Sequence, residues 1–274
     1  MYIVADIGGT KTRVARSHDL EKFDEPVIID TVQDYEKGIE AFSEAIGKAA
    51  GGEKIDAIAT DLAGVLSHDK RMVTGARHLP FWRSHDIVGE LEKKFDTKVY
   101  MENDTAQVGL GEAVFGAGKG ASIVVYITVS TGVNGIRIVD GVIEKAALGF
   151  EIGGQYLSIG EPSRTLEDFI SGKAISEKYG VSSPKMIDKD STVWEELAQY
   201  TAYGVHNTIL HWSPNRVVLG GSMFNEIGIK VDAVHANVQK IMKKFPEVPE
   251  IVHSSLGDLG GLWGGLAILK SKIN

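Results

Sequence analysis

The 274-residue sequence predicts an α/β protein. Short runs rich in β-branched residues alternate along the chain with segments whose apolar residues recur at helical spacing. Such alternation is typical of sheets covered by helices. Hydrophobic residues make up 43% of the chain and charged residues 24%, so one large domain or two modest ones can each bury a core.

The first predicted strand, at residues 2–5, runs into the sequence DIGGTKT, and residues 12–15 regain β character. Residues 34–52 place apolar side chains near helical spacing and end on two glycines, which predicts an amphipathic helix with a glycine stop. The alternation continues with a strand at 54–64, a helix at 84–95, and strands at 97–104 and 121–132.

A glycine-rich segment, residues 109–120, ends a helix that starts near Asp104 and separates two parts of the chain. We expect a smaller N-terminal α/β domain at 1–105 and a larger C-terminal α/β domain at 106–274. A glycine-rich turn then leads into a C-terminal helix at about 263–274. This helix is a candidate to pack on the smaller domain.

The longest helical pattern, residues 194–212, leads into a buried strand that ends at two glycines. A strand followed by a Gly/Thr turn therefore occurs near Asp6, near Ser130 and again at Gly220. This distant repetition suits two related halves.

Composition excludes several kinds of site. The formal net charge of −8 argues against nucleic acid or an anionic membrane as the main partner, because either would favour a basic surface. The chain has no cysteine, which excludes disulfides, thiolate zinc sites and cysteine nucleophiles. It begins directly with a strand-like segment and has no apolar run of membrane-spanning length, so we expect a cytoplasmic protein.

The motif DIGGTKT allows two interpretations. Its glycines expose backbone N–H groups, and Thr10 and Lys11 add a hydroxyl and a cation, which together suit a phosphate. The alternative is a tight hairpin whose glycines supply positive φ angles. Both can hold, because residues 12–15 return as a strand.

Asp104 follows a predicted buried strand and begins a helix. It is either an N-cap or a general base, with Asn103 beside it as a hydrogen-bonding partner for a hydroxyl-rich ligand. Likewise, Ser130 to Gly132 either present hydroxyl and amide donors to phosphates or simply form a hairpin. Glu151 and Glu167 either hold sugar hydroxyls or lie on the solvated surface.

The order and separations of these motifs resemble the ROK family of sugar kinases across essentially the whole chain. The segments that carry the resemblance are DIGGTKT, LAG (62–64), LPFW (79–82), ENDT, STGV, GFEIGG, LEDFISG, VVLGGS and LGDLGGLWGGLA. The resemblance implies an actin-like ATPase (ribonuclease H-like) fold with two α/β domains around a central cleft that binds sugar and ATP. A homodimer is a further family-level expectation.

The resemblance also implies residue roles. Asp104 is the catalytic base that takes the proton from the sugar hydroxyl, and Asp6 is an outer contact of Mg²⁺, which ATP oxygens and water largely hold. Sugar hydroxyls are held by Asn103, Asp104, Glu151, Glu167 and backbone near Gly64. The first phosphate loop comprises Gly8, Gly9, Thr10 and Lys11, the second comprises Ser130, Thr131 and Gly132, and Gly220 and Gly221 lie against the adenosine.

The chain departs from the family pattern in four places. Gly154 stands where the family motif E-x-G-H usually has a histidine, and the zinc-binding cysteine cluster is missing, so no zinc is expected. His78 replaces a common asparagine, and Ser130 replaces a usual glycine. Each lost sugar hydrogen bond costs roughly 0.5 to 1.5 kcal/mol, which can redirect sugar choice without abolishing transfer.

We therefore expect an ATP- and Mg²⁺-dependent kinase that phosphorylates a hexose or related amino sugar at a primary hydroxyl. Phosphoryl transfer depends mainly on positioning and charge neutralisation, to which a general base adds. Two alternatives stay open. One is a non-catalytic sugar-sensing or regulatory protein of the same fold, and the other is a polyphosphate-dependent sugar kinase. The sequence leaves the identity of the sugar open.

Overall fold

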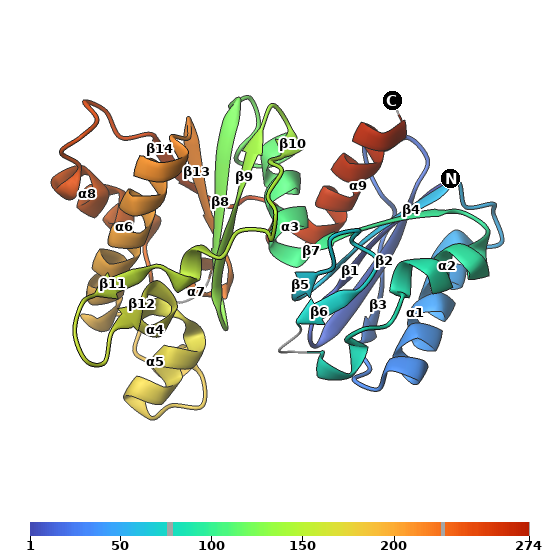
Figure 1. The fold of residues 1–274 in the computed structure, drawn as a ribbon, viewed down its shortest axis with the longest axis horizontal. Helices are drawn as coiled ribbons and strands as arrows, with labels where there is room; N and C mark the ends of the chain where they lie inside the picture. The colour runs from blue at the N-terminus through green and yellow to red at the C-terminus, as the bar shows by residue number, and fades with distance from the viewer. Residues whose placement is uncertain (76–78, 226–227, 274) are drawn as a thin grey trace. The chain divides into compact units, whose positions relative to one another are not determined.

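The computed structural model describes residues 1–75, 79–225 and 228–273, and the chain divides into two compact units (Figure 1). Unit 1 comprises Met1–Phe115, Lys145–Gly149 and Leu256–Asn274, and unit 2 comprises Gly116–Glu144 and Phe150–Ser255. Each unit is built on a mixed sheet, which confirms the predicted α/β class.

The main sheet of unit 1 has the strand order β3-β2-β1-β4-β7. Its strands are β1 (Tyr2–Ile7), β2 (Lys11–Ser17), β3 (Val27–Asp30), β4 (Ala57–Leu62) and β7 (Lys98–Asn103). Strands β1 and β2 form an antiparallel hairpin, whereas β4 and β7 continue the sheet parallel to β1. The carboxyl ends of β1, β4 and β7 therefore meet at one edge, where Ile7, Leu62 and Asn103 are in register.

Helices α1 (Tyr35–Ala50) and α2 (Ile87–Phe95) cover one face of this sheet (Figure 1). Their apolar side chains share a core with Ile3, Ala5 and Ile7, the alternate residues of β1. Helix α1 has the predicted ends, because Asp34 caps it and Gly51 ends it in the left-handed conformation. The short strands β5 (Val65–Leu66) and β6 (Val73–Gly75) form a separate hairpin after β4.

Helices α3 (Asp104–Val114) and α9 (Gly260–Ile273) pack closely against each other within unit 1. A Cβ at Gly264 would lie 1.8 Å from the carbonyl oxygen of Gln107, and one at Gly111 would lie 2.7 Å from the backbone nitrogen of Gly264. Glycine is required at these two positions because the two backbones approach too closely for side chains. Of the glycines expected to form a turn before the helix, Gly260 and Gly261 belong to α9, whereas Gly257 precedes it.

Helix α3 lies in unit 1, so the chain leaves this unit after Phe115, whereas the sequence predicts a domain boundary after Thr105. The physical reason for the later exit is the contact of α3 with α9, which the sequence does not place beside it. The division of the chain into domains remains a prediction.

Unit 2 repeats the topology of unit 1. Its sheet has the order β10-β9-β8-β13-β14, in which β8 and β9 form an antiparallel hairpin and β13 and β14 continue parallel to β8. The strands are β8 (Ile123–Val129), β9 (Val133–Val139), β10 (Val142–Ile143), β13 (Arg216–Gly220) and β14 (Glu250–His253). The shared strand order confirms the two related halves predicted from the repeated Gly/Thr turns.

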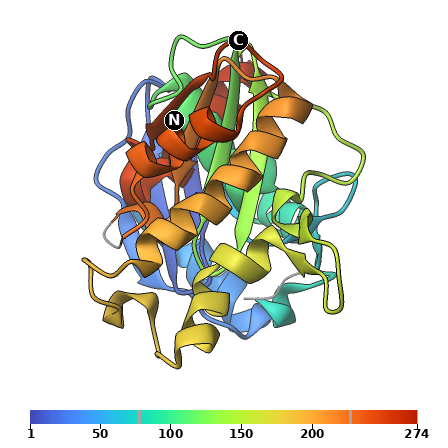
Figure 2. The ribbon, with the colours of Figure 1, turned by 90° about the vertical axis from the view of Figure 1, so that its left-hand side faces the viewer.

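Helices α6 (Val193–Trp212) and α8 (Val231–Ile241) cover one face of the sheet in unit 2 (Figure 2). Their core includes Val125 and Ile127 of β8. The remaining elements of unit 2 are β11 (Tyr156–Ser158), β12 (Arg164–Thr165), α4 (Leu166–Ile170), α5 (Gly172–Tyr179) and α7 (Ser222–Asn225), with short 3₁₀ turns between some of them. Within the described part of the chain, none of the helices has the length and apolar character needed to cross a membrane.

Candidate active site

Acidic residues gather at the carboxyl edge of the parallel strands in unit 1. Asp6 lies on β1, Asp61 lies on β4, and Asp104 begins the helix that follows β7. Ligands of open α/β sheets bind outside the carboxyl ends of the strands. This edge is therefore the candidate active site of unit 1, and it contains the predicted Asp6, Asn103 and Asp104.

Asn103, and not Asp104, caps α3. The Asn103 side-chain oxygen accepts a hydrogen bond from the backbone N–H of Ala106 (3.2 Å), so the N-cap interpretation of Asp104 is wrong. Asp104 is the first helical residue, and its Oδ1 accepts from the N–H of Thr105 (2.8 Å). A carboxylate in this first turn is stabilised by the helix dipole. The role of Asp104 as a general base stays a prediction.

Asn103 also connects two predicted sugar contacts. Its Nδ2 donates to the carbonyl oxygen of Gly64 at 2.9 Å, which ties the end of β7 to the loop after β4. Gly64 has φ +137°, a conformation that favours glycine. The structure thus brings Asn103 and Gly64 together, although 39 positions separate them in the sequence.

The structure adds Asp61 and Gln107, which the sequence reasoning missed. Asp61 has no exposed surface; its Oδ1 accepts from the N–H of Ile7 and its Oδ2 from Nε2 of Gln107, both at 3.0 Å. Burial raises the pKa of Asp61 well above its usual range, and the charges of Asp6 and Asp104 raise it further. An acidic residue inside the apolar run IATDLAG is the signal that could have found it.

Asp6 is the predicted outer contact of Mg²⁺. Burial raises the pKa of Asp6, and the guanidinium of Arg13, 3.2 Å away, opposes that rise. Among the described residues, no cluster of three or more His, Cys, Asp or Glu side chains is arranged to hold a metal ion. The role of Asp6 as an outer contact of Mg²⁺ stays a prediction.

The first predicted phosphate loop, Gly8 to Lys11, is the turn of the β1–β2 hairpin, as the sequence predicts. The N–H of Gly8 donates to the carbonyl oxygen of Lys11 at 3.0 Å. Neither Gly8 nor Gly9 has a positive φ, so the turn does not need glycine for its dihedral angles. A Cβ at Gly8 would lie 3.1 Å from the carbonyl oxygen of Lys11, so close packing within the hairpin favours glycine at that position. Lys11 pairs with Asp30 of β3, with 2.5 Å between Nζ and Oδ1.

The second predicted phosphate loop, Ser130 to Gly132, is the turn between β8 and β9, which confirms the hairpin. The N–H of Ser130 donates to the carbonyl oxygen of Gly132 at 2.9 Å, and the N–H of Gly172 donates to the carbonyl oxygen of Ser130 at 2.7 Å. The beginning of α5 therefore holds this loop from one side.

Glu167 lies directly beside that loop. Its Oε2 accepts a hydrogen bond from the N–H of Val133 at 2.9 Å, and a Cβ at Gly132 would lie 2.9 Å from the same oxygen. The alternative of a solvated surface residue is therefore wrong for Glu167, which is half-buried and engaged with the backbone of β9.

Glu151 precedes the 3₁₀ turn Ile152–Gly154 and is exposed. It lines a cavity of about 350 Å³ with residues of the turn, of the segment that follows it and of α6, namely Ile152, Gln155, Tyr156, Asn207, Thr208, His211 and Trp212. A Cβ at Gly154 would meet nothing within 4 Å, so packing does not require glycine at this position. His78 lies outside the described residues.

Gly220 ends β13 and Gly221 follows it, both in close contact with β8. A Cβ at Gly220 would lie 2.6 Å from the hydroxyl of Tyr126, and one at Gly221 would lie 2.4 Å from the carbonyl oxygen of Val129. Gly221 also has φ +94°. Packing alone therefore requires glycine at both positions, whether or not an adenosine lies against them.

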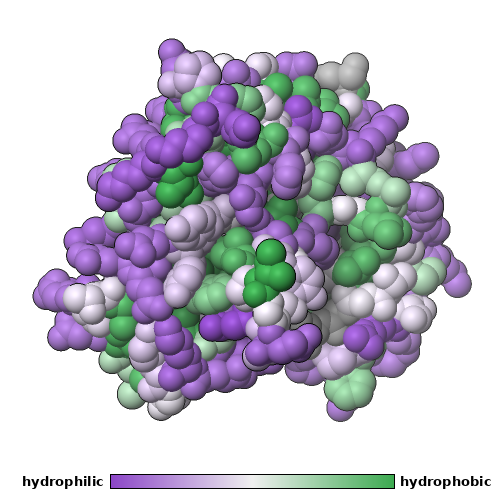
Figure 3. Space-filling model, turned by 60° about the vertical axis from the view of Figure 1, so that its left-hand side comes forward, coloured by the Kyte–Doolittle hydropathy of each residue, from purple (hydrophilic) through white to green (hydrophobic). Residues whose placement is uncertain are grey.

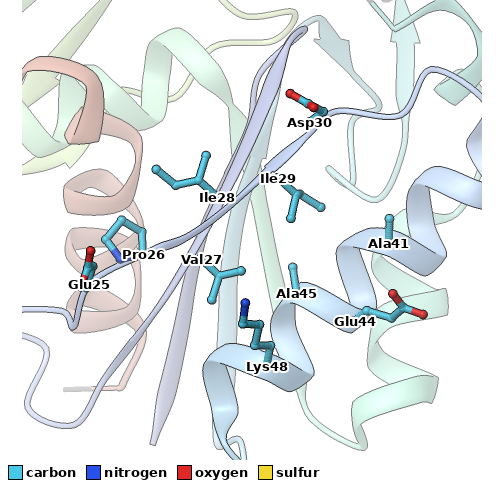
Figure 4. A pocket seen from close by; sticks show the side chains of 10 residues that line it. All are labelled: Glu25, Pro26, Val27, Ile28, Ile29, Asp30, Ala41, Glu44, Ala45 and Lys48. Carbon is cyan, nitrogen blue, oxygen red and sulfur yellow. The ribbon is translucent and has the colours of Figure 1, made fainter.

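A cavity of about 580 Å³ lies between β3 and α1, and its lining includes none of the predicted site residues (Figure 4). Val27 and Ile29 point toward α1, and Ala41, Ala45 and Lys48 line the opposite wall. The face drawn in Figure 3 is mostly hydrophilic, with hydrophobic side chains in small separate groups. Scattered groups of this size are ordinary for a globular surface and identify no binding site by themselves.

Comparisons with known proteins bear on these features. A family model described as the ROK family matches residues 2–272. The chain is 25% identical to a glucokinase of Thermotoga maritima over 99% of this chain and 98% of that protein. It is 24% identical to a fructokinase of Pediococcus pentosaceus over 71% of this chain and 72% of that protein.

Among solved structures, the chain is similar to a ROK family glucokinase from Streptomyces griseus in complex with glucose and AMPPNP. The TM-score is 0.80 at 21% identity, covering 98% of this chain and 99% of that one. This likeness confirms the predicted actin-like fold.

Proposed function

The chain belongs to the ROK family, and we propose that it is an ATP-dependent carbohydrate kinase acting on a hexose or a related amino sugar at a primary hydroxyl. Glucokinase and fructokinase relatives support a hexose acceptor, and the similar structure with glucose and AMPPNP supports a nucleotide donor.

The observation that carries the proposal is the placement of Asp104. It begins α3 at the carboxyl edge of the parallel strands, and Asn103 performs the capping that would otherwise explain an acidic residue there. An aspartate at such an edge is suited to accept a proton from a bound hydroxyl group.

In the proposed reaction, Asp104 accepts the proton of the sugar hydroxyl while the hydroxyl oxygen attacks the γ-phosphorus of ATP. The bond between that phosphorus and the β–γ bridging oxygen breaks, and ADP leaves with the bonding electrons. Magnesium, with Asp6 as an outer contact, would neutralise charge on the phosphate oxygens. The buried Asp61 stabilises this edge of the sheet, because it accepts a hydrogen bond from Ile7 beside Asp6.

The other predicted residues bind and orient the two substrates. Gly64, Asn103, Glu151 and Glu167 hold sugar hydroxyls, whereas Gly8, Gly9, Thr10 and Lys11 and the loop Ser130, Thr131 and Gly132 bind phosphates. Gly220 and Gly221 lie against the adenosine. The two glycines of the first loop carry no side chains that would block the approach of a phosphate to its backbone N–H groups, which supports this role.

A coupled ADP-release assay over a panel of glucose, fructose, mannose and their N-acetylamino derivatives tests the proposal. The same panel is run with polyphosphate, with sugar phosphate as the readout. We expect turnover with ATP and at least one sugar. Sugar binding by calorimetry without turnover from either donor would instead assign the chain to sugar sensing, and turnover with polyphosphate alone would replace ATP as the donor.

A further inference from the structure

The segment 166–173 holds the Ser130–Gly132 loop at several points within unit 2. Besides the bonds from Glu167 to Val133 and from Gly172 to Ser130, the N–H of Lys173 donates to the carbonyl oxygen of Thr131 at 3.4 Å. This short segment therefore donates hydrogen bonds to two carbonyl groups of the loop and accepts one from the first N–H of β9.

We propose that Glu167 is a positioning residue for this second phosphate loop, and that it couples sugar binding to nucleotide binding. The inference rests on the proposed function, in which Glu167 holds a sugar hydroxyl and Ser130 to Gly132 bind phosphates. It adds a second task for Glu167, which is to keep the loop in its nucleotide-binding form.

The local structure fixes Glu167 for this task. It is the second residue of α4, whose N-terminus carries a capping box between Thr165 and Asp168. The capping box sets the direction in which α4 begins, and the Glu167 carbonyl accepts from the N–H of Ser171, where α5 starts. The backbone of Glu167 is thus held on both sides, which fixes the point from which its side chain reaches the loop.

Gly132 makes the approach of the carboxylate possible. A Cβ there would lie 2.9 Å from Oε2 of Glu167, closer than real side-chain carbons approach such an atom. The glycine of this loop is therefore explained by the neighbouring carboxylate. The N–H of Val133 donates this bond to a carboxylate, and hydrogen bonds to charged groups are stronger than neutral ones.

The coupling follows from the chemistry of one carboxylate. A carboxylate has two oxygens and accepts several hydrogen bonds at once, so it can serve a backbone N–H and a sugar hydroxyl together. A bound hydroxyl restricts the Glu167 side chain, and the loop then loses less conformational freedom when phosphates bind. Such a coupling is reciprocal, so nucleotide must raise sugar affinity by the same factor.

The test measures binding of Mg²⁺–AMPPNP by calorimetry, first without sugar and then with saturating glucose, or with the substrate found in the panel. Glu167→Met removes the acceptor while keeping the size of the side chain, and Glu167→Gln keeps a neutral acceptor. The matched control is Glu177→Met on α5, where the glutamate side chain is 69% exposed.

We expect Glu167→Met to bind AMPPNP about tenfold more weakly than the wild type even without sugar, the loss typical of a hydrogen bond to a charged group. Glu167→Gln should recover most of that affinity, whereas Glu177→Met should match the wild type. In Glu167→Met, the factor by which sugar strengthens AMPPNP binding should fall to about one.

Wild-type AMPPNP affinity in Glu167→Met without sugar would overturn the inference. A residue that only contacts the sugar does not affect AMPPNP binding when no sugar is present, so this result would leave Glu167 with that role alone. If Glu167→Met does not fold, Gly132→Ala provides the second test, since its Cβ displaces the carboxylate and should weaken AMPPNP binding similarly. Wild-type affinity in Gly132→Ala would contradict the inference as well. Failure of the proposed function is distinguishable, because it appears as missing turnover in the wild type.

Discussion

The side chain of Asn103 accepts a hydrogen bond from Ala106 and donates one to the carbonyl oxygen of Gly64, so one residue caps α3 and holds the loop after β4. Both contacts lie next to the proposed base, Asp104. Their two effects can be separated by substitution.

Asn103→Ala should lower the free energy of unfolding by about 2 kcal/mol, of which about 1 comes from the cap and about 1 from the bond to Gly64. Asn103→Ser keeps a good N-cap but is too short to reach Gly64, so it should lose only about 1 kcal/mol. Urea denaturation of both variants checks this difference. Equal losses would show that the cap does not contribute.

Asp104→Asn should lower kcat by about 10² to 10⁴-fold, because the amide cannot accept the hydroxyl proton. The KM for sugar should change little, since asparagine retains hydrogen-bonding capacity. The matched control, Asp96→Asn, lies at an exposed position of the same unit and should keep wild-type turnover. Near-normal kcat in Asp104→Asn would remove Asp104 from the mechanism.

Asp61 should make stability depend on pH. Its pKa is raised in the folded protein, so its contribution is fully present below the unfolded pKa of about 3.9 and is lost as pH rises through the folded pKa. Asp61→Asn lacks this titration. As pH rises above about 4, the free energy of unfolding of Asp61→Asn should therefore increase relative to that of the wild type. Denaturation curves between pH 4 and 9 measure the difference, and a constant difference would contradict the prediction.

Gly154→His should fold normally, because nothing lies within 4 Å of the new Cβ. If the family histidine acts here as it does in the pattern that the chain resembles, the KM for sugar should fall by about two- to tenfold, the value of one hydrogen bond. The KM for ATP should not change. Gly154→Ala serves as the control, and a KM that does not differ between the two variants would argue against a sugar contact at this position.

Gly264→Ala should destabilise unit 1 by about 3 kcal/mol or more, because its Cβ would lie 1.8 Å from the carbonyl oxygen of Gln107. Gly47→Ala is the matched control in α1, where a Cβ meets nothing within 4 Å. The free energy of unfolding of this control should rise by up to about 1 kcal/mol, because alanine has a higher helix propensity than glycine. Thermal or urea unfolding distinguishes the two, and similar stabilities would refute the proposed packing requirement.

Much of the fold could be predicted because its signals are local. The hairpins at Gly8 to Lys11 and Ser130 to Gly132 are marked by turn residues between β runs, and the start of α3 is marked by polar residues after a strand. The sequence offers Asp104 as an N-cap, whereas Asn103 caps the helix, since Asn and Asp are almost equally good at this position. The homodimer and the cytoplasmic location remain predictions.

By itself, the sequence determined the α/β class, the two related halves, the glycine turns and the family. Each of these depends on residues that are close along the chain or on the order of motifs. Only the tertiary structure decided which groups meet: Ile7 with Asp61 across 54 positions, Asn103 with Gly64 across 39, and Val133 with Glu167 across 34. Strand pairing and helix packing bring these atoms together, and no local pattern records such contacts. The burial of Asp61 and the placement of Glu167 beside the phosphate loop follow from them.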